Sequence, residues 1–195
     1  MTARGLGCVL TVVFAVLAGC DAQGPKFKNT DVTGAEWGRE LALTGHDGKP
    51  RTLADFRGKV VVLAFGFTHC PDICPTTLSE LRQAKEKLGG DGARMQVLFV
   101  TLDPERDTQG VLAQYVPAFD PGFLGLYGDL DATARTAKEF KVFFQKSPGP
   151  APGAYSIDHS TGSYVFDQQG RLRLVVGHSQ LATVVDDIRT LLKGG

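Results

Sequence analysis

The sequence lacks an excess of charge of either sign. Its 195 residues carry 21 Lys and Arg against 21 Asp and Glu, so the formal net charge is zero. A nucleic-acid surface or a polybasic membrane patch would need a marked surplus of basic residues. We therefore expect no nucleic-acid partner. A hydrophobic share of 43% and a charged share of 22% are typical of one globular domain with a sizeable core.

The apolar run near the N-terminus is too short to cross a bilayer without strain. LGCVLTVVFAVLAG has fourteen residues, which as a helix span about 21 Å against the roughly 30 Å of a hydrocarbon core. With MTARG before it, the run resembles a secretory signal peptide. It ends in LAGC, which resembles a bacterial lipobox with Cys20 as the acylated residue. We predict a lipoprotein signal peptide at residues 1–19; the alternatives are an uncleaved anchor and ordinary secretion.

The residues after the signal predict where the domain is held. Asp21 resembles the inner-membrane retention signal of some Gram-negative lipoproteins, so we expect the periplasmic face of the cytoplasmic membrane, reached through lipid on Cys20. Residues 20–35 are polar with few large apolar side chains, and are predicted to form the lipidated N-terminus and a tether. Residues 36–195 are predicted to form the folded domain.

Cysteine is scarce, with four residues in the whole chain. Cys8 lies in the predicted signal and Cys20 is assigned to lipid, so only Cys70 and Cys74 remain in the domain. In an oxidising compartment such a pair would ordinarily form a disulfide. A bridge across three residues constrains very little chain, however, so its structural value is small. The pair is therefore predicted to serve chemistry, as a redox pair, a peroxide-reactive thiol or a metal clamp.

The hydrophobic pattern alternates buried strands with amphipathic helices. KVVVLAFGF and MQVLFVTLD are continuous apolar runs of strand length, typical of central strands buried on both faces. The pattern predicts a hairpin at 41–53, strands at 59–67, 95–103 and 123–129, helices at 75–88, 107–114, 131–142 and 181–192, a hairpin at 163–177, and a long Pro/Gly-rich loop at 146–160. This order predicts an α/β, thioredoxin-like sandwich with a central mixed sheet, helices on both faces and an extra N-terminal hairpin.

The segment CPDIC is expected to bring its two sulfur atoms together at the start of a helix. Pro75 disfavours an α conformation for Cys74 and is itself favoured at the first helical position. Pro71-Asp72 suits the centre of a turn that folds Cys70 back toward Cys74. Both sulfurs would then lie near a helix N-terminus, whose dipole favours thiolate.

Three segments carry a resemblance to a known family. GFTHCPDICPTTL, LDPERDT and DHST resemble the signature of the Sco/SenC family, thioredoxin-fold proteins of copper delivery to cytochrome c oxidase. The resemblance covers about residues 30–193. It implies that Cys70, Cys74 and His159 hold one copper ion per chain. It also implies partners: the subunit of the oxidase that bears the CuA site, other periplasmic copper proteins, and thiol reductases.

The chemistry of these side chains agrees with the resemblance. Two thiolates and an imidazole form a soft ligand set that suits Cu(I) and tolerates Cu(II). Zinc accepts the same ligands but usually takes a fourth. Since His159 lies 85 residues after Cys74, only the fold can bring them together. A site with three ligands also leaves a coordination position open for a partner.

Two further functions stay open beside copper delivery. The CxxxC pair would also serve a periplasmic thiol–disulfide oxidoreductase or a redox sensor, so enzymatic activity is left undecided. Against a general reductase, the spacing differs from CxxC, and Thr161 stands where the fold's usual proline is expected. ICPTT echoes a thiol peroxidase, but Pro71 occupies the position of the threonine that such enzymes require.

Five other polar residues near these motifs are given simpler roles. His69 is expected in a strand with its side chain on the opposite face, His46 in a solvated turn, and His178 outside the site. Asp158 is a candidate to orient the neighbouring histidine ring, although an adjacent acid is more often solvated. Asp107, in the segment DPERD, is expected to cap a helix, with a rim beside the site as the alternative for that segment.

Overall fold

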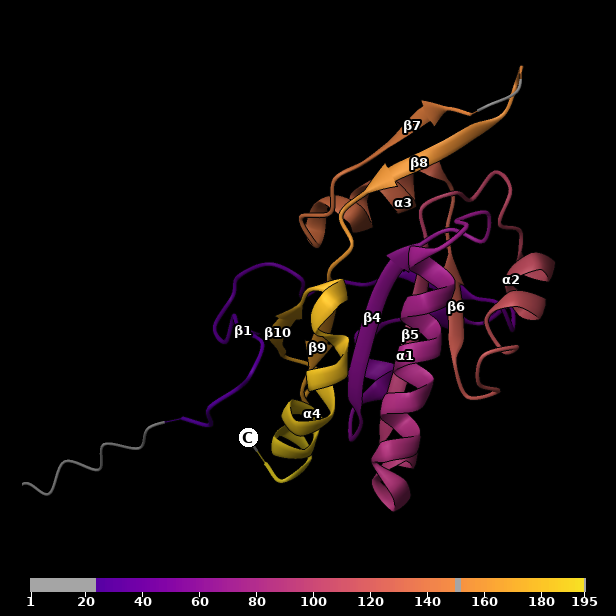
Figure 1. Cartoon of the computed structure of the whole chain (residues 1–195). Helices are drawn as coiled ribbons and strands as arrows, with labels where there is room; N and C mark the ends of the chain where they lie inside the picture. Colours follow the sequence, from indigo (N-terminus) through magenta and orange to yellow (C-terminus); the bar gives the residue numbers. More distant parts are fainter. Residues whose placement is uncertain (1–23, 150–151, 195) are drawn as a thin grey trace, which may run out of the picture.

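One mixed β-sheet organises the protein. The computed structural model describes residues 24–149 and 152–194, so the predicted signal peptide and Cys20 lie outside the described residues. The sheet has the strand order β1-β10-β9-β4-β5-β6-β2-β3 (Figure 1). Its strands are β1 (Thr30–Asp31), β2 (Leu43–Gly45), β3 (Pro50–Arg51), β4 (Val60–Gly66), β5 (Met95–Thr101), β6 (Leu124–Tyr127), β9 (Ser163–Phe166) and β10 (Leu172–Val176).

The centre of the sheet confirms the two predicted buried strands. All seven residues of β4 and all seven of β5 are buried, as their continuous apolar runs predict. β4 pairs with β5 in parallel and with β9 antiparallel, so the sheet is mixed. The predicted hairpin between β9 and β10 also forms, with Gly170 at a φ of 78° in its turn. That left-handed conformation is one that glycine adopts without strain.

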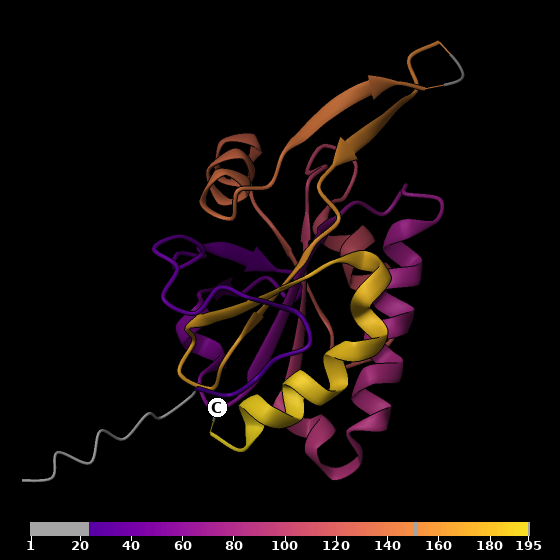
Figure 2. The same ribbon diagram turned by 60° about the vertical axis from the view of Figure 1, so that its left-hand side comes forward.

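Helices cover both faces of the sheet (Figure 2). The helices are α1 (Ile73–Lys87), α2 (Gln109–Tyr115), α3 (Leu130–Glu139) and α4 (Val184–Leu192), with the 3-10 turns η1 (Leu53–Phe56), η2 (Gly89–Arg94) and η3 (His178–Thr183). α1 and α4 lie side by side on one face, and α3 lies on the other. No helix in the described ranges is long and apolar enough to cross a membrane.

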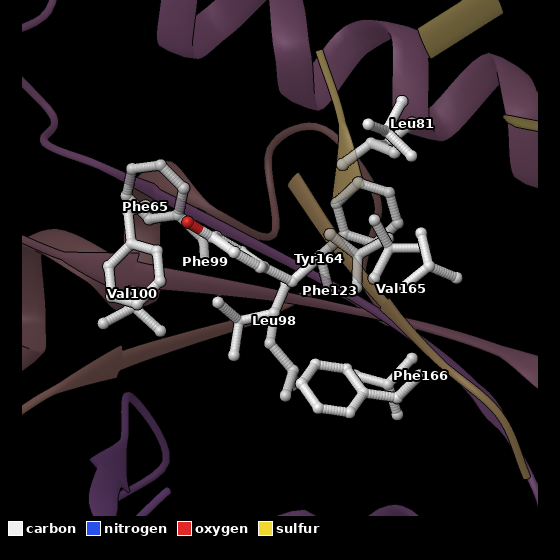
Figure 3. Close-up of a cluster of buried hydrophobic side chains, with 14 of the residues drawn as sticks. Phe65, Leu81, Leu98, Phe99, Val100, Phe123, Tyr164, Val165 and Phe166 are labelled. Carbon is white, nitrogen blue, oxygen red and sulfur yellow. The ribbon is translucent and has the colours of Figure 1, made fainter. Parts of the chain in front are cut away.

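Consecutive residues at the end of β4 point into different halves of the core. The Phe65 ring packs on Phe140, directly after α3, and on Tyr164 of β9. The next residue, Gly66, faces Cys74 of α1 and the Phe99 ring instead. Figure 3 shows several of these aromatic side chains in the core beside the central strands. The end of β4 is therefore packed tightly on both faces where the cysteine loop begins.

The segment predicted as a long loop, residues 146–160, forms most of a hairpin, so that prediction is wrong. β7 (Phe144–Pro148) and β8 (Tyr155–His159) pair antiparallel in a second sheet that projects from the body of the fold (Figure 1). Pro148 stands at the far end of the ladder, where its missing N–H costs little, since a two-stranded ribbon consists only of edge strands. Gly149 N–H then donates to Ala154 C=O at 2.9 Å, which closes the hairpin.

The described fold begins earlier than the expected boundary at residue 36. β1 pairs with β10, although it lies within the predicted tether at residues 20–35. The Asp187 carboxylate of α4 accepts the backbone N–H of Lys28 at 2.8 Å and that of Asn29 at 3.0 Å. It also accepts the Asn29 side-chain amide at 2.7 Å. The last part of the predicted tether is therefore fixed to α4 and to the edge of the sheet.

Candidate metal centre

The loop from β4 to α1 places the two cysteines together. Helix α1 begins at Ile73, so Cys74 lies inside its first turn rather than before it. Pro75 fits at the third helical position, because the N–H that it lacks would have no partner in a first turn. Cys74 N–H donates to Cys70 Sγ at 3.4 Å, so Cys70 is folded back as predicted. Both cysteines are free, without a disulfide between them.

His159 reaches the same place from the end of β8. Its Nε2 lies 4.0 Å from Cys74 Sγ, and its Nδ1 lies 2.8 Å from the Ser160 carbonyl oxygen. A carbonyl accepts only, so Nδ1 carries the proton and Nε2 is left free to bind a ligand. The ring is thus oriented by backbone, whereas Asp158, the candidate for that role, is exposed. The Phe67 ring packs edge-on against the imidazole, 6.0 Å between centroids.

The spacing of these atoms suits one metal ion. With metal–sulfur bonds of about 2.3 Å and metal–nitrogen bonds of about 2.0 Å, a sulfur and a nitrogen ligand of one ion lie roughly 3.5–3.7 Å apart at tetrahedral or trigonal angles. Cys74 Sγ and His159 Nε2 are 4.0 Å apart, so a small further approach would bring them to that spacing. In the described ranges no group of three or more His, Cys, Asp or Glu side chains is already gathered closely enough to hold a metal.

The space beside Cys74 and His159 also argues for an ion rather than an organic molecule. A cavity of about 10 Å³ lies among Cys74, Thr77, His159 and Thr161. That volume is about what one water molecule needs. The soft sulfur and nitrogen donors at its wall fit a copper-like ion. Thr161 occupies the position considered for a cis-proline, and the described residues contain no cis peptide bond.

Burial controls the protonation of Cys74. The side chain is 3% exposed, and burial raises the pKa of its thiol well above the ordinary value. A backbone hydrogen bond from Phe67 opposes this shift but is the weaker influence. The expected stabilisation of thiolate by the helix dipole is therefore wrong for Cys74. It is a protonated thiol at neutral pH, and a metal must displace that proton to bind.

Asp107 is a structural residue of the site that the sequence pattern did not identify. The cap of α2 is Thr108, whose Oγ1 accepts the Val111 N–H at 3.4 Å, so the predicted capping role of Asp107 is wrong. The Asp107 carboxylate is fully buried and accepts the Thr68 N–H at 2.9 Å, the Thr68 hydroxyl at 2.5 Å and the Thr101 hydroxyl at 2.6 Å. It thereby ties the cysteine loop to the end of β5.

The other histidines of the described chain have different partners. His69 lies in the cysteine loop rather than in a strand, with Nδ1 3.9 Å from Asp107 Oδ1. His46 is not simply solvated: its Nδ1 accepts the Gly125 N–H at 3.0 Å, and burial lowers its pKa. His178 Nδ1 lies 3.1 Å from the Thr77 hydroxyl, linking η3 to α1. Of the candidates, only His159 is in contact with a cysteine sulfur.

Fold and site together define a thioredoxin-like domain with a candidate metal site of two cysteines and one histidine at the end of its central strand. The chain belongs to the SCO1/SenC family, whose family model matches residues 29–193. Cys74 contacts both Cys70 and His159, while the role of the three residues as ligands stays a prediction.

Similarity to individual proteins supports this assignment. The chain is 39% identical over 153 residues to Protein SCO2 homolog, mitochondrial, of Mus musculus, a match that covers 77% of this chain and 60% of that protein. The solution structure of apo Sco1 from Thermus thermophilus is 43% identical, with a TM-score of 0.76 over 86% of this chain and 98% of that one. Bradyrhizobium japonicum ScoI with copper bound is 33% identical, with a TM-score of 0.73 over 81% of this chain and all of that one.

Proposed function

We propose that this chain is a copper chaperone that holds one copper ion with Cys70, Cys74 and His159. It would deliver that ion to the CuA site of cytochrome c oxidase, or prepare the thiols of that site. The observation that carries the proposal is the 4.0 Å approach of His159 to Cys74 across 85 residues of sequence. A thiol reductase has no need of a histidine at that point. Copper bound to ScoI of Bradyrhizobium japonicum supports copper as the ion.

A thiol–disulfide oxidoreductase or redox sensor is the second candidate. The free, neighbouring cysteines favour it, since Cys70 and Cys74 could close into a disulfide. Their two electrons and two protons would then reduce a disulfide on a partner, giving two thiols there. The raised pKa of Cys74 makes that residue a poor attacking thiol, which leaves the attack to Cys70. We rank copper delivery first because His159 lies 4.0 Å from Cys74, a contact that thiol exchange does not require.

Oxidase assembly is expected to separate the two functions. In a host deleted for this chain, the wild-type gene should restore cytochrome c oxidase activity, while the Cys70→Ser, Cys74→Ser and His159→Ala variants should each fail. A thiol reductase would need both cysteines and not the histidine. Full restoration by His159→Ala, with neither Cys→Ser variant active, would therefore contradict copper delivery and support thiol reduction. Oxidase activity per membrane protein is the measurement, with immunoblots to match expression.

We further propose that lipid on Cys20 holds the domain on the periplasmic face of the inner membrane. The support is the LAGC segment after a short apolar run, with Asp21 next to the cysteine. Mass spectrometry of the membrane-extracted protein should show an N-terminus at Cys20 that carries a diacylglyceryl group. Cys20→Ser should release the domain from membranes. Recovery of intact residues 1–19 would instead indicate an uncleaved anchor.

A further inference from the structure

The β7–β8 hairpin depends on side chains for its position over the cysteines. Its two strands hydrogen-bond to each other and form a sheet separate from the large one. Figures 1 and 2 show the hairpin standing out from the body of the fold. Something other than strand pairing must therefore fix the angle at which His159 meets Cys74.

Three residues form the less exposed of the contacts between the hairpin and the loop that follows β5; the exposed ion pair of Lys146 with Glu105 is the other. The Arg106 guanidinium lies over the Tyr155 ring, 3.6 Å from its centroid, and Nη1 donates to the Tyr155 carbonyl oxygen at 3.0 Å. The Tyr155 hydroxyl donates to Asp103 Oδ1 at 2.8 Å, and Arg106 Nε forms an ion pair with the same carboxylate. We call Asp103, Arg106 and Tyr155 the latch.

The latch is partly shielded from water, so its contacts are stronger than those of a surface pair. The Asp103 side chain has no exposed area and that of Arg106 is 24% exposed. A guanidinium stacked on an aromatic ring gains a further attraction when both are desolvated. Burial, with the hydrogen bond to Asp103 and its charge, raises the pKa of Tyr155 to about 12. The hydroxyl therefore stays a donor throughout the physiological range.

Because Tyr155 and His159 belong to the same strand, fixing the position of Tyr155 also restricts the position of His159. Side chains alternate along a strand, so Tyr155, Ile157 and His159 share one face of β8. Ile157 between them is 4% exposed, which shows that this face turns toward the body of the fold. At about 3.3 Å per residue, the latched tyrosine lies about 13 Å from the histidine along one stiff, paired strand.

The same loop also holds the cysteines. Asp107, one residue after Arg106, binds Thr68 in the cysteine loop through its buried carboxylate. Asp103 N–H donates to the Thr101 hydroxyl at 2.9 Å, and that hydroxyl in turn donates to Asp107. Residues 103–107 therefore contact both the cysteine loop, through Thr68, and the hairpin that carries His159, through Tyr155.

We propose that Arg106 and Tyr155 are positioning residues for the copper site, acting through His159. This inference rests on the proposed function, since it takes His159 as a copper ligand. With the latch closed, the imidazole is held beside Cys74; with the latch open, the hairpin can lift and leave an ion on the two sulfurs alone. A docking partner that draws Arg106 away from Tyr155 would thereby lower the coordination of copper and favour its transfer.

The test is a double-mutant cycle on the purified full chain. Dissociation constants for Cu(II) are measured by competition with a chelator for wild type, Arg106→Ala, His159→Ala and the double variant. Arg106→Ala should weaken binding about 10- to 100-fold, as expected when a residue that orients a metal ligand is lost. In the His159→Ala background it should cause no further loss, because the two residues act through one ligand.

Two other variants keep the result interpretable. Tyr155→Phe retains the stacked ring and removes only the hydroxyl, so it should fold and give a smaller loss of affinity and a shifted thiolate–Cu(II) absorption band. Arg82→Ala, which removes an exposed arginine paired with Glu86 on α1, is the matched control and should bind as wild type.

Each outcome decides between distinct conclusions. Unchanged affinity in Arg106→Ala and Tyr155→Phe, or an equal loss with and without His159, overturns the latch. If His159→Ala itself binds Cu(II) as wild type does, the proposed copper site fails instead, and the latch fails with it. Wild-type binding that depends on His159 but not on Arg106 leaves the proposed function standing without the latch.

Discussion

Loss of any one of Cys70, Cys74 and His159 should weaken Cu(II) binding by more than about 100-fold. The reason is that residues that merely orient a metal ligand already contribute about 10- to 100-fold. Binding should saturate at one ion per chain, because the described residues bring one pair of cysteines to one histidine. Titration of the reduced full chain, followed by chelator competition, measures both quantities.

The three variants should differ in which oxidation state they still accept. His159→Ala keeps both sulfurs, so it should retain Cu(I), which tolerates two soft ligands. It should lose Cu(II) affinity together with the thiolate-to-Cu(II) charge-transfer band. His178→Ala is the control, since that imidazole contacts the Thr77 hydroxyl instead of a sulfur. A charge-transfer band that persists unchanged in His159→Ala means that the ligand assignment is wrong.

The pH dependence of the same constant gives a second check. Burial raises the pKa of Cys74, so the free protein carries a proton on that thiol at neutral pH, and copper displaces it. The apparent copper affinity therefore rises with pH at values below that pKa and falls as the solution is made more acidic. The change is about tenfold per pH unit for each proton released. An affinity that does not vary with pH would exclude Cys74 thiolate as a ligand.

Gly66→Ala should destabilise both the fold and the proposed copper site. An added Cβ would lie 2.6 Å from Cys74 Sγ and 2.8 Å from Phe99 Cε2, closer than real contacts allow. Neither neighbour can retreat easily, because Cys74 is 3% and Phe99 1% exposed. Overpacking of this kind costs about 1–3 kcal/mol. Since the displaced atom is a proposed ligand, copper affinity should fall as well. Urea unfolding and chelator competition are the measurements.

Gly110→Ala is the matched control for that substitution. Gly110 lies in α2, and nothing stands within 4 Å of an added Cβ. Alanine there should stabilise the protein by up to about 1 kcal/mol, because glycine is the poorer helix former. Copper affinity should not change. If Gly66→Ala were as stable as wild type and bound copper as tightly, the packing described around Cys74 would be wrong.

The central part of the fold is the part that sequence predicts best. β4 and β5 are continuous apolar runs, and such runs have few alternatives to a strand buried on both faces. The turn at Gly170 and the apolar face of α4 likewise depend on neighbouring residues only. Local signals of this kind are strong because each is repeated several times within one short segment.

The hairpin that carries His159 shows where local signals fail. Its prolines and glycines predict a loop when residues 146–160 are taken alone. The strands form because Phe144 pairs with His159 and Pro148 pairs with Tyr155. Neither segment has a composition that predicts a strand by itself. A two-stranded ribbon also has two edges, so it tolerates a proline that a central strand would not.

Asp107 is a second residue whose structural role could not be predicted from the neighbouring sequence. In the segment DPERD a carboxylate is expected at the surface, because buried acids are rare unless they are paired. Its burial becomes favourable only through donors on Thr68 and Thr101, which belong to other segments. The cysteine pair, by contrast, was predictable, since its spacing and flanking prolines are local. His159 could be connected to the pair only through the family resemblance.

The clasp between Asp187 and the first described residues has a mechanical consequence. Lys28 and Asn29 are held by α4, and both ribbon views place this start of the described chain near the C-terminus, away from the β7–β8 hairpin (Figures 1 and 2). A force applied along the N-terminal segment would act on the hydrogen bonds to Asp187 and on the pairing of β1 with β10. It would therefore not act on the loops around the cysteine sulfurs. A domain attached to a membrane at this end would have the proposed copper site at the far end of α1, a helix whose 15 residues span about 22 Å.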